Sequence, residues 1–166
     1  MSVTTLISVE EYLRTSYQDG DREYIDGRVV ERNLGTTDHA HCQSRMLFFL
    51  LGNYPKRWSS VEVRVQVKPT RFRIPDVTCI WGPKPESSII HEPPFLVIEV
   101  LSPDDRAEDV QEKVDDYLSF GIQYVWVVNP RTRRGYVYTP EGMREAKDGV
   151  MRTANPEIAL PLSAVL

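Results

Sequence analysis

The chain has 166 residues, of which 41% are hydrophobic and 27% are charged, and its formal net charge is −4. These values are typical of one globular domain with its own core, which we expect to span residues 1–166. The acidic balance excludes a strongly basic nucleic-acid coat but is compatible with a locally basic cleft. Its two cysteines, Cys42 and Cys79, form no CxxC pair, so a structural zinc site is not expected and a disulfide stays open.

The first 20 residues contain Glu10, Glu11 and Arg14 and no apolar segment, so we expect no signal peptide. No run approaches the 18 or so apolar residues of a membrane span. The sequence therefore predicts a cytoplasmic protein without a membrane segment.

The N-terminal half predicts a helix, a hairpin and a second helix. Ser8 followed by Glu11 is a capping-box pattern and opens a short helix over 8–17. The pair Asp26-Gly27 predicts the turn of a hairpin. A helix over 39–54, capped by Thr37 or Asp38, is expected to be central, because its apolar surface is broad. That surface is a stripe of Leu47, Phe48, Leu51 and Tyr54, widened by Met46, Phe49 and Leu50.

The remaining elements predict a sheet. Residues 61–68 alternate between valine and polar residues, which indicates a half-buried strand, and 72–81 form the next strand, irregular near Pro75. The order of strand 94–101, helix 106–120 and strand 124–128 predicts a parallel β-α-β crossover. Ser102-Pro103-Asp104-Asp105 resembles the helix entry, Gly121 is the expected C-cap, and 135–138 is expected to be the final strand. Residues 140–166 are weakly patterned.

Two isolated carboxylates stand out in these strands. Glu99 lies in the apolar run 94–101, where an ionised carboxylate is unfavourable unless it is paired, protonated or bound to a metal. Asp76 precedes another apolar stretch. One or two carboxylates are the usual protein ligands of Mg²⁺, and the backbone carbonyl of Val100 is a natural further ligand. The alternative is that Glu99 pairs with a basic side chain and Asp76 caps a turn.

Four further sets of residues have weaker patterns. Lys113 flanks the apolar face of its helix and could orient water or neutralise phosphate, although periodicity alone favours a lysine that packs structurally or pairs with Asp109. Glu23 and His41 could line a cleft or lie on the surface. The remaining set, which could meet a phosphate backbone or form a solvated face, is Arg64, Lys68, Arg71 and Arg73.

Several segments together resemble the Uma2 family, a bacterial group of restriction-endonuclease-like proteins. They are the segment Ile74-Pro75-Asp76-Val77, the segment 97–103 with sequence VIEVLSP, the helical Lys113 and the segment 124–130 with sequence YVWVVNP. The upstream segment 23–27, EYIDG, and the helix containing His41 are also similar to that family. The resemblance covers roughly residues 8–139.

The resemblance implies a PD-(D/E)XK nuclease fold of the mixed α/β class, with a central mixed β-sheet flanked by helices. It also implies that Asp76 and Glu99 bind Mg²⁺ or Mn²⁺. The usual lysine position, two residues after the glutamate, is Leu101 here, so the role passes to Lys113. Glu23 matches an N-terminal acidic residue near the metal.

We therefore expect a Mg²⁺- or Mn²⁺-dependent endonuclease that acts on DNA as a homodimer. Its catalytic residues would be Asp76, Glu99, Lys113 and Glu23, with metal ligands from Asp76, Glu99 and Val100. Two alternatives stay open. The first is a non-catalytic nucleic-acid-binding or regulatory module that keeps the fold, and the second is a scaffold whose carboxylates are structural.

Overall fold

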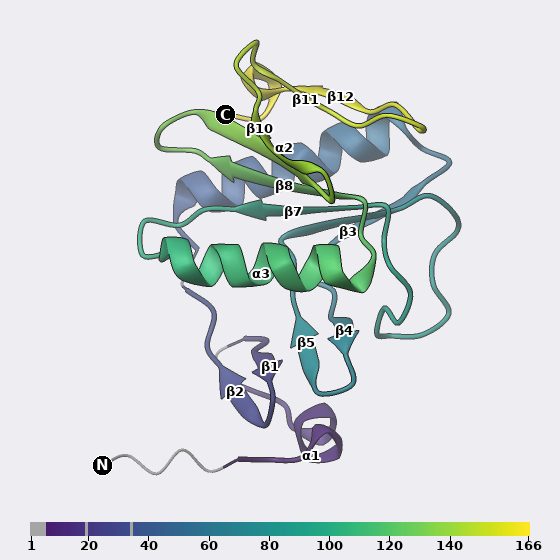
Figure 1. Ribbon diagram of the computed structural model, residues 1–166, viewed down its shortest axis with the longest axis vertical. Coiled ribbons are helices and arrows are strands. Elements are labelled where there is room, and N and C mark those ends of the chain that lie inside the picture. The colour runs from purple at the N-terminus through teal and green to yellow at the C-terminus, as the bar shows by residue number, and fades with distance from the viewer. Residues whose placement is uncertain (1–5, 19, 34) are drawn as a thin grey trace.

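A computed structural model describes residues 6–18, 20–33 and 35–166 of the chain (Figure 1). The helices are α1 (Val9–Arg14), α2 (Thr37–Asn53) and α3 (Ala107–Phe120), with a 3-10 turn at Leu162–Ala164. The strands are β1 (Glu23–Ile25), β2 (Arg28–Val30), β3 (Trp58–Val61), β4 (Val65–Lys68), β5 (Arg71–Arg73), β6 (Val77–Ile80), β7 (Leu96–Val100), β8 (Tyr124–Asn129), β9 (Arg134–Thr139), β10 (Gly142–Glu145), β11 (Val150–Arg152) and β12 (Ala159–Pro161).

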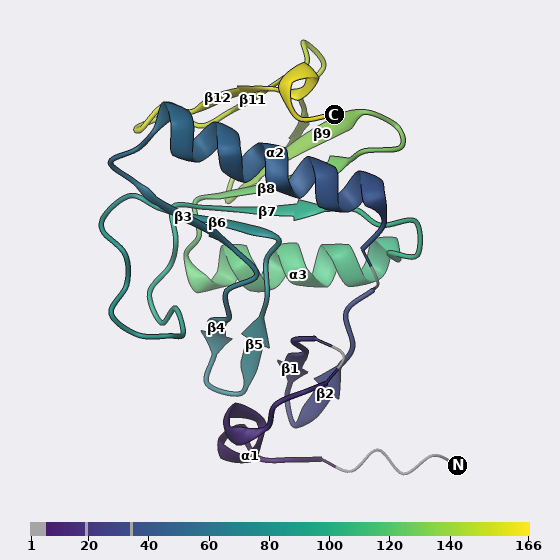
Figure 2. The ribbon, with the colours of Figure 1, turned by 180° about the vertical axis from the view of Figure 1, so that it is seen from behind.

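The centre of the molecule is a six-stranded mixed sheet with the order β10-β9-β8-β7-β6-β3. Strands β7 and β8 run parallel, and the other neighbouring pairs run antiparallel. The predicted β-α-β unit is confirmed, since α3 connects β7 to β8. Helices α2 and α3 cover opposite faces of this sheet (Figures 1 and 2). All five residues of β7 are buried, as the apolar run predicted.

A smaller sheet, with the order β2-β1-β5-β4, lies beside the large one. The prediction of two continuous strands, at 61–68 and 72–81, was wrong. Each is interrupted where the chain passes from one sheet to the other, so β3 and β6 belong to the large sheet and β4 and β5 to the small one. Glu62 has a φ of 54°, which ends β3, and Pro75 lacks the N–H that a continuous strand would need. The second break lies between β5 and β6 and places Asp76 at the junction of the two sheets.

The N-terminal predictions hold with shorter boundaries. The Ser8 hydroxyl accepts a hydrogen bond from the Glu11 N–H at 3.1 Å, and the helix ends at Arg14 and not at residue 17. Asp26 and Gly27 have φ values of 49° and 95°, the positive values that a type I′ hairpin turn requires.

Helix α2 differs from its prediction in its cap and its buried face. Its N-cap is Thr36, whose hydroxyl accepts from the His39 N–H, so Thr37 and Asp38 lie inside the helix. The predicted stripe was wrong, because Phe48 is 74% exposed and Leu51 is 46% exposed. The buried residues are His39, Cys42, Met46 and Leu50. A helix with apolar residues on most of its circumference has no unique face, and contact with the sheet selects one.

Helix α3 begins and ends close to its predicted bounds. Gly121 is its C-cap, with a φ of 108°. The predicted entry at 102–105 is instead a separate turn, in which the Ser102 N–H donates to the Asp105 carboxylate at 2.7 Å. The N-cap is Arg106, which makes no capping hydrogen bond with its side chain.

The C-terminal residues are more ordered than their pattern suggested. The strand predicted at 135–138 is not the last, because β10 pairs with β9, and β11 and β12 form a separate antiparallel ribbon. Met151, Ile158 and Leu160 are buried in the same cluster as Met46 and Leu50 of α2. This ribbon therefore contributes to the core on the α2 face.

Cys42 and Cys79 are both buried and free, and Cys79 is a core residue as expected. In the described part of the chain, no helix is long and apolar enough to cross a membrane.

Candidate active site

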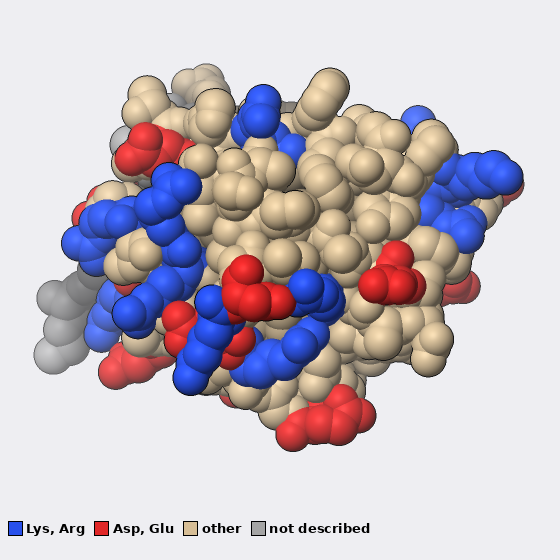
Figure 3. Space-filling model, turned by 90° about the horizontal axis from the view of Figure 1, so that it is seen from above, with Lys and Arg blue, Asp and Glu red and all other residues tan. Residues whose placement is uncertain are grey.

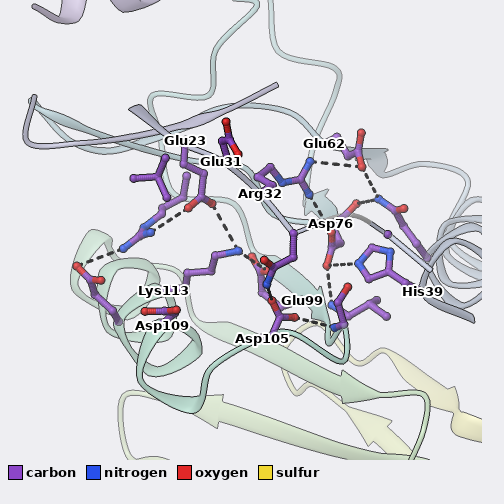
Figure 4. Close-up of a pocket in the computed structure, with 18 of the residues that line it drawn as sticks. Glu23, Glu31, Arg32, His39, Glu62, Asp76, Glu99, Asp105, Asp109 and Lys113 are labelled. Carbon is purple, nitrogen blue, oxygen red and sulfur yellow. Dashed lines mark hydrogen bonds and ion pairs between the residues drawn. The ribbon is translucent and has the colours of Figure 1, made fainter. Parts of the chain in front are cut away.

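A cavity of about 330 Å³ lies where α2, α3, β1 and the end of β7 meet (Figure 4). Its lining is dominated by charged side chains, and it includes all four predicted catalytic residues, Glu23, Asp76, Glu99 and Lys113, together with Arg73 of the basic set. The backbone of Val100 also lines it. The structure thus brings together residues from β1, from the β5–β6 junction, from β7 and from α3.

Asp76 is buried in the segment that connects β5 to β6, and both of its carboxylate oxygens are hydrogen-bonded. One oxygen accepts from Arg32 at 3.0 Å, and the other accepts from the Val100 N–H at 2.7 Å and contacts His39 Nε2 at 3.2 Å. Burial opposes ionisation, but His39, the Val100 N–H and Arg32 outweigh it and lower the pKa of Asp76. Asp76 is therefore a carboxylate at neutral pH.

Glu99 lies next to Asp76, because the antiparallel register of β6 and β7 pairs Val77 with Ile98. Its oxygens accept from the Tyr117 hydroxyl at 2.6 Å and from Lys113 Nζ at 3.1 Å. Burial, with the nearby charges of Asp76 and Glu23, raises its pKa to about 7 although Lys113 and Tyr117 act in the opposite direction. The neutral and ionised forms of Glu99 are therefore close in free energy near neutral pH.

Lys113 and Glu23 complete the group. Lys113 Nζ lies 3.6 Å from Glu23, in addition to its contact with Glu99, and its side chain keeps 22% exposure. Burial disfavours its charge, but Glu99, Glu23 and Asp76 outweigh this and raise its pKa, so Lys113 stays an ammonium. Glu23 is buried and accepts from Arg73 at 2.9 Å and from the Ile74 N–H at 3.1 Å. The sequence left open whether Glu23 lines a cleft or lies on the surface, and in the structure it lines the cavity.

Three residues of the site were missed by sequence reasoning: Arg32, His39 and Tyr117. The sequence directed attention to His41, which is exposed, whereas His39 is the histidine that contacts Asp76. The spacing of His39 with Cys42, Met46 and Leu50 follows one helical face and was the available signal. Arg32 lies in an irregular segment between β2 and α2, where periodicity gives no information.

The basic strand-turn-strand does not present a free basic face. Arg73 is buried between Asp116 and Glu23, at 2.8 Å and 2.9 Å. Arg71 and Lys68 also bind Asp116, at 3.0 Å and 3.1 Å. The fourth member, Arg64, lies over the ring of Tyr12. Three of the four basic residues therefore pair with a carboxylate of α3, and of these Lys68 keeps a side chain that is 47% exposed.

The donor set of the cavity fits a hard divalent cation. Asp76 and Glu99 supply carboxylate oxygens beside the backbone of Val100, and Mg²⁺ is usually held by one or two carboxylates with several waters. Within residues 6–18, 20–33 and 35–166, no group of three or more His, Cys, Asp or Glu side chains is gathered as metal ligands. A cation here would therefore depend on two carboxylates, a carbonyl and water.

The mixed sheet between two helices, with this cavity at the end of β7, defines a restriction-endonuclease-like protein of the PD-(D/E)XK type. The family model of Uma2, described as "Putative restriction endonuclease", matches residues 9–163. The chain therefore belongs to the Uma2 family, and the resemblance found in its sequence is confirmed.

A solved structure shows the same fold. It is described as the crystal structure of "a putative nuclease belonging to DUF820" from Anabaena variabilis ATCC 29413. The two chains superpose with a TM-score of 0.81 at 21% sequence identity, over 96% of this chain and 97% of the other. No curated protein matches this chain.

Proposed function

We propose that this protein is an endonuclease that uses Mg²⁺ or Mn²⁺ to hydrolyse phosphodiester bonds in DNA. The observation that supports this most is the convergence of Asp76, Glu99 and Lys113 in one charged cavity of a nuclease-family fold. Asp76, Glu99 and the Val100 carbonyl would hold the cation. A bound divalent cation would lower the pKa of a water and offset the charge that builds up on the phosphate.

Each protein group then has a distinct part in the reaction. Lys113 would orient the attacking water and neutralise phosphate charge, and its position as an ammonium 3.1 Å from Glu99 supports this role. Glu23 positions Lys113 from the opposite side, at 3.6 Å. Tyr117 donates to Glu99, and its pKa is raised well above the usual value by burial, so it remains a donor throughout. A homodimer would supply one such cavity for each strand of a duplex.

The test is nicking of supercoiled plasmid DNA in the presence of Mg²⁺ or Mn²⁺, with and without EDTA. We expect Asp76→Asn, Glu99→Gln and Lys113→Met each to reduce the rate about 100-fold or more, because each removes a group that acts on the reacting atoms. Glu108→Gln is the matched control, since Glu108 is an exposed carboxylate on the same helix as Lys113. Calorimetric titration with Mn²⁺ should show binding to the wild type and to Glu108→Gln, and not to Glu99→Gln.

Two results would contradict the proposal. If the wild type binds DNA but does not nick it, and Asp76→Asn binds equally well, the protein is a binding module. If nicking survives EDTA, the metal assignment is wrong. Light scattering of the purified protein tests the dimer independently.

A further inference from the structure

The turn between β8 and β9 carries a concentration of positive charge that the active site does not use. Arg131, Arg133 and Arg134 occur within four residues, and no Asp or Glu occurs between Asp116 and Glu141. All three arginines are exposed. Arg134 lies 3.6 Å from Glu145, but its side chain is 61% exposed, so this pair is weak.

Other arginines of the molecule are engaged in a way that these are not. Arg71 and Arg73 bind Asp116, and Arg57 stacks on the ring of Trp81 at 3.7 Å. In the part of the chain that the structure describes, the side chains of Arg131 and Arg133 make no hydrogen bond or ion pair. The turn therefore presents guanidinium groups to an outside anion on a protein whose net charge is negative.

The turn lies at the same end of the sheet as the catalytic cavity. Strand β8 is the parallel neighbour of β7, with Glu99 opposite Val127, and the Leu101 N–H donates to the Val128 carbonyl at 2.8 Å. Val127 is in turn opposite Tyr136 of β9, so Tyr136 lies two strands from Glu99 and about 10 Å across the sheet, given a strand spacing of about 4.8 Å. Arg134 is opposite Asn129, two residues along β9 from Tyr136, which places its backbone about 12 Å from that of Glu99 at a rise of about 3.4 Å per residue. Lys and Arg side chains gather at this end in the view from above (Figure 3).

The turn is held in a fixed shape. The Asn129 side chain accepts from the N–H groups of Arg131 and Thr132, at 3.1 Å and 3.2 Å. Gly135, at its base, packs so closely that a Cβ there would lie 2.3 Å from the sulfur of Met151. A turn anchored to the core presents its arginines at a constant position relative to the cavity.

We propose that the β8–β9 turn binds the phosphodiester backbone of a nucleic acid that enters the catalytic cavity. The inference rests on the proposed nuclease function and adds the surface that receives the substrate. Guanidinium groups pair with phosphate oxygens in a bidentate manner, and neighbouring phosphates of one strand can engage neighbouring arginines. Residues 129–135 expose no large hydrophobic side chain, so an acidic protein would lack the apolar anchor that protein interfaces use.

The test is the salt dependence of nucleic-acid binding, measured by fluorescence anisotropy in EDTA so that nothing is cleaved. The full chain is titrated onto labelled duplex DNA and onto duplex RNA of the same sequence. The turn variant carries Arg131→Gln, Arg133→Gln and Arg134→Gln. The control variant carries Arg14→Gln, Lys56→Gln and Lys84→Gln, three exposed residues on other elements with the same change in charge.

We expect the turn variant to bind tenfold or more weakly, and the slope of log K against log[KCl] to become less steep by about 2–3, since each lost phosphate contact contributes about 0.9. The control variant should stay within twofold of the wild type. The DNA and RNA arms show which backbone is preferred.

Four outcomes would overturn the inference. Equal losses in the two variants would mean that total charge, and not the turn, determines binding. Displacement of the nucleic acid by polyglutamate at equal charge concentration would assign the turn to acidic polypeptides. If the wild type nicks plasmid DNA and the turn variant binds nucleic acid as tightly as the wild type does, the β8–β9 turn is not the binding surface, but the proposed nuclease function stands. If the wild type binds no nucleic acid, both fail.

Discussion

The raised pKa of Glu99 predicts that this carboxylate reduces the stability of the fold at neutral pH. Its pKa rises from 4.5 to about 7 through burial and the neighbouring carboxylates. A carboxyl group with a raised pKa binds its proton more tightly in the folded state. Stability is therefore lost as the pH rises from 4.5 to 7, and stays at the lower level above that range. At 1.36 kcal/mol for each pKa unit, the loss is about 3 kcal/mol.

Glu99→Gln should remove this loss, because glutamine resembles the protonated acid and leaves Lys113 with its contact to Glu23. At pH 8 we expect the variant to be more stable than the wild type by about 3 kcal/mol, which corresponds to a rise in Tm of about 6–12 °C for a chain of this size. At pH 4.5 the two proteins should differ by less than about 1 kcal/mol. Urea denaturation followed by circular dichroism at both pH values measures the difference, with Glu108→Gln as the control.

The same pair of proteins reports on the metal. A divalent cation that binds only the folded wild type should stabilise it by about 2.7 kcal/mol at 100 times its Kd, and should leave Glu99→Gln unchanged. A variant that is less stable than the wild type at pH 8, or a difference that does not change with pH, would refute the reasoning. If the variant is the less stable protein at pH 8, Glu99 forms a stabilising ion pair with a basic side chain, which is the alternative to metal binding that the sequence left open.

Three other predictions concern the scaffold. Asp116→Asn should reduce the stability by about 1–3 kcal/mol, measured by urea denaturation, because Arg71 and Arg73 lose a buried carboxylate partner but keep their contacts with Glu112. Gly135→Ala should lower it by about 1–3 kcal/mol, since the new methyl group would overlap Met151; an unchanged Tm would contradict the close packing. Leu50→Ala should lower the stability by about 2–5 kcal/mol, because Leu50 is buried, and Phe48→Ala should lower it by less than about 0.5 kcal/mol, because Phe48 is exposed. Similar losses of stability in the two variants would mean that the opposite face of α2 is buried.

Local sequence signals located much of the fold. The capping residue Ser8, the Asp26-Gly27 turn and the Gly121 C-cap are each determined by the conformations that a few neighbouring residues permit. The β-α-β unit followed from two apolar runs, at 94–101 and 124–128, on either side of a segment with helical spacing. Glu99 was conspicuous because a carboxylate in a fully apolar strand needs a partner, whatever the fold around it.

Tertiary structure decided the features that depend on distant contacts. The interruption at Pro75 that places Asp76 beside Val100 arises because one hairpin is shared by two sheets. The choice of His39 over His41 depends on which face of α2 meets the sheet, and the continuous apolar run at 46–51 does not specify that face.

The ion pairs of the site lay beyond the sequence for the same reason. Arg32 reaches Asp76 across 44 positions of the chain, and Arg73 reaches Glu23 across 50. Sequence spacing carries no information on such pairs, since their geometry exists only after the sheets and α3 have packed. The sequence alone therefore identified the residue types of the candidate site, and only the packed structure determined which of them share one cavity and how each is charged.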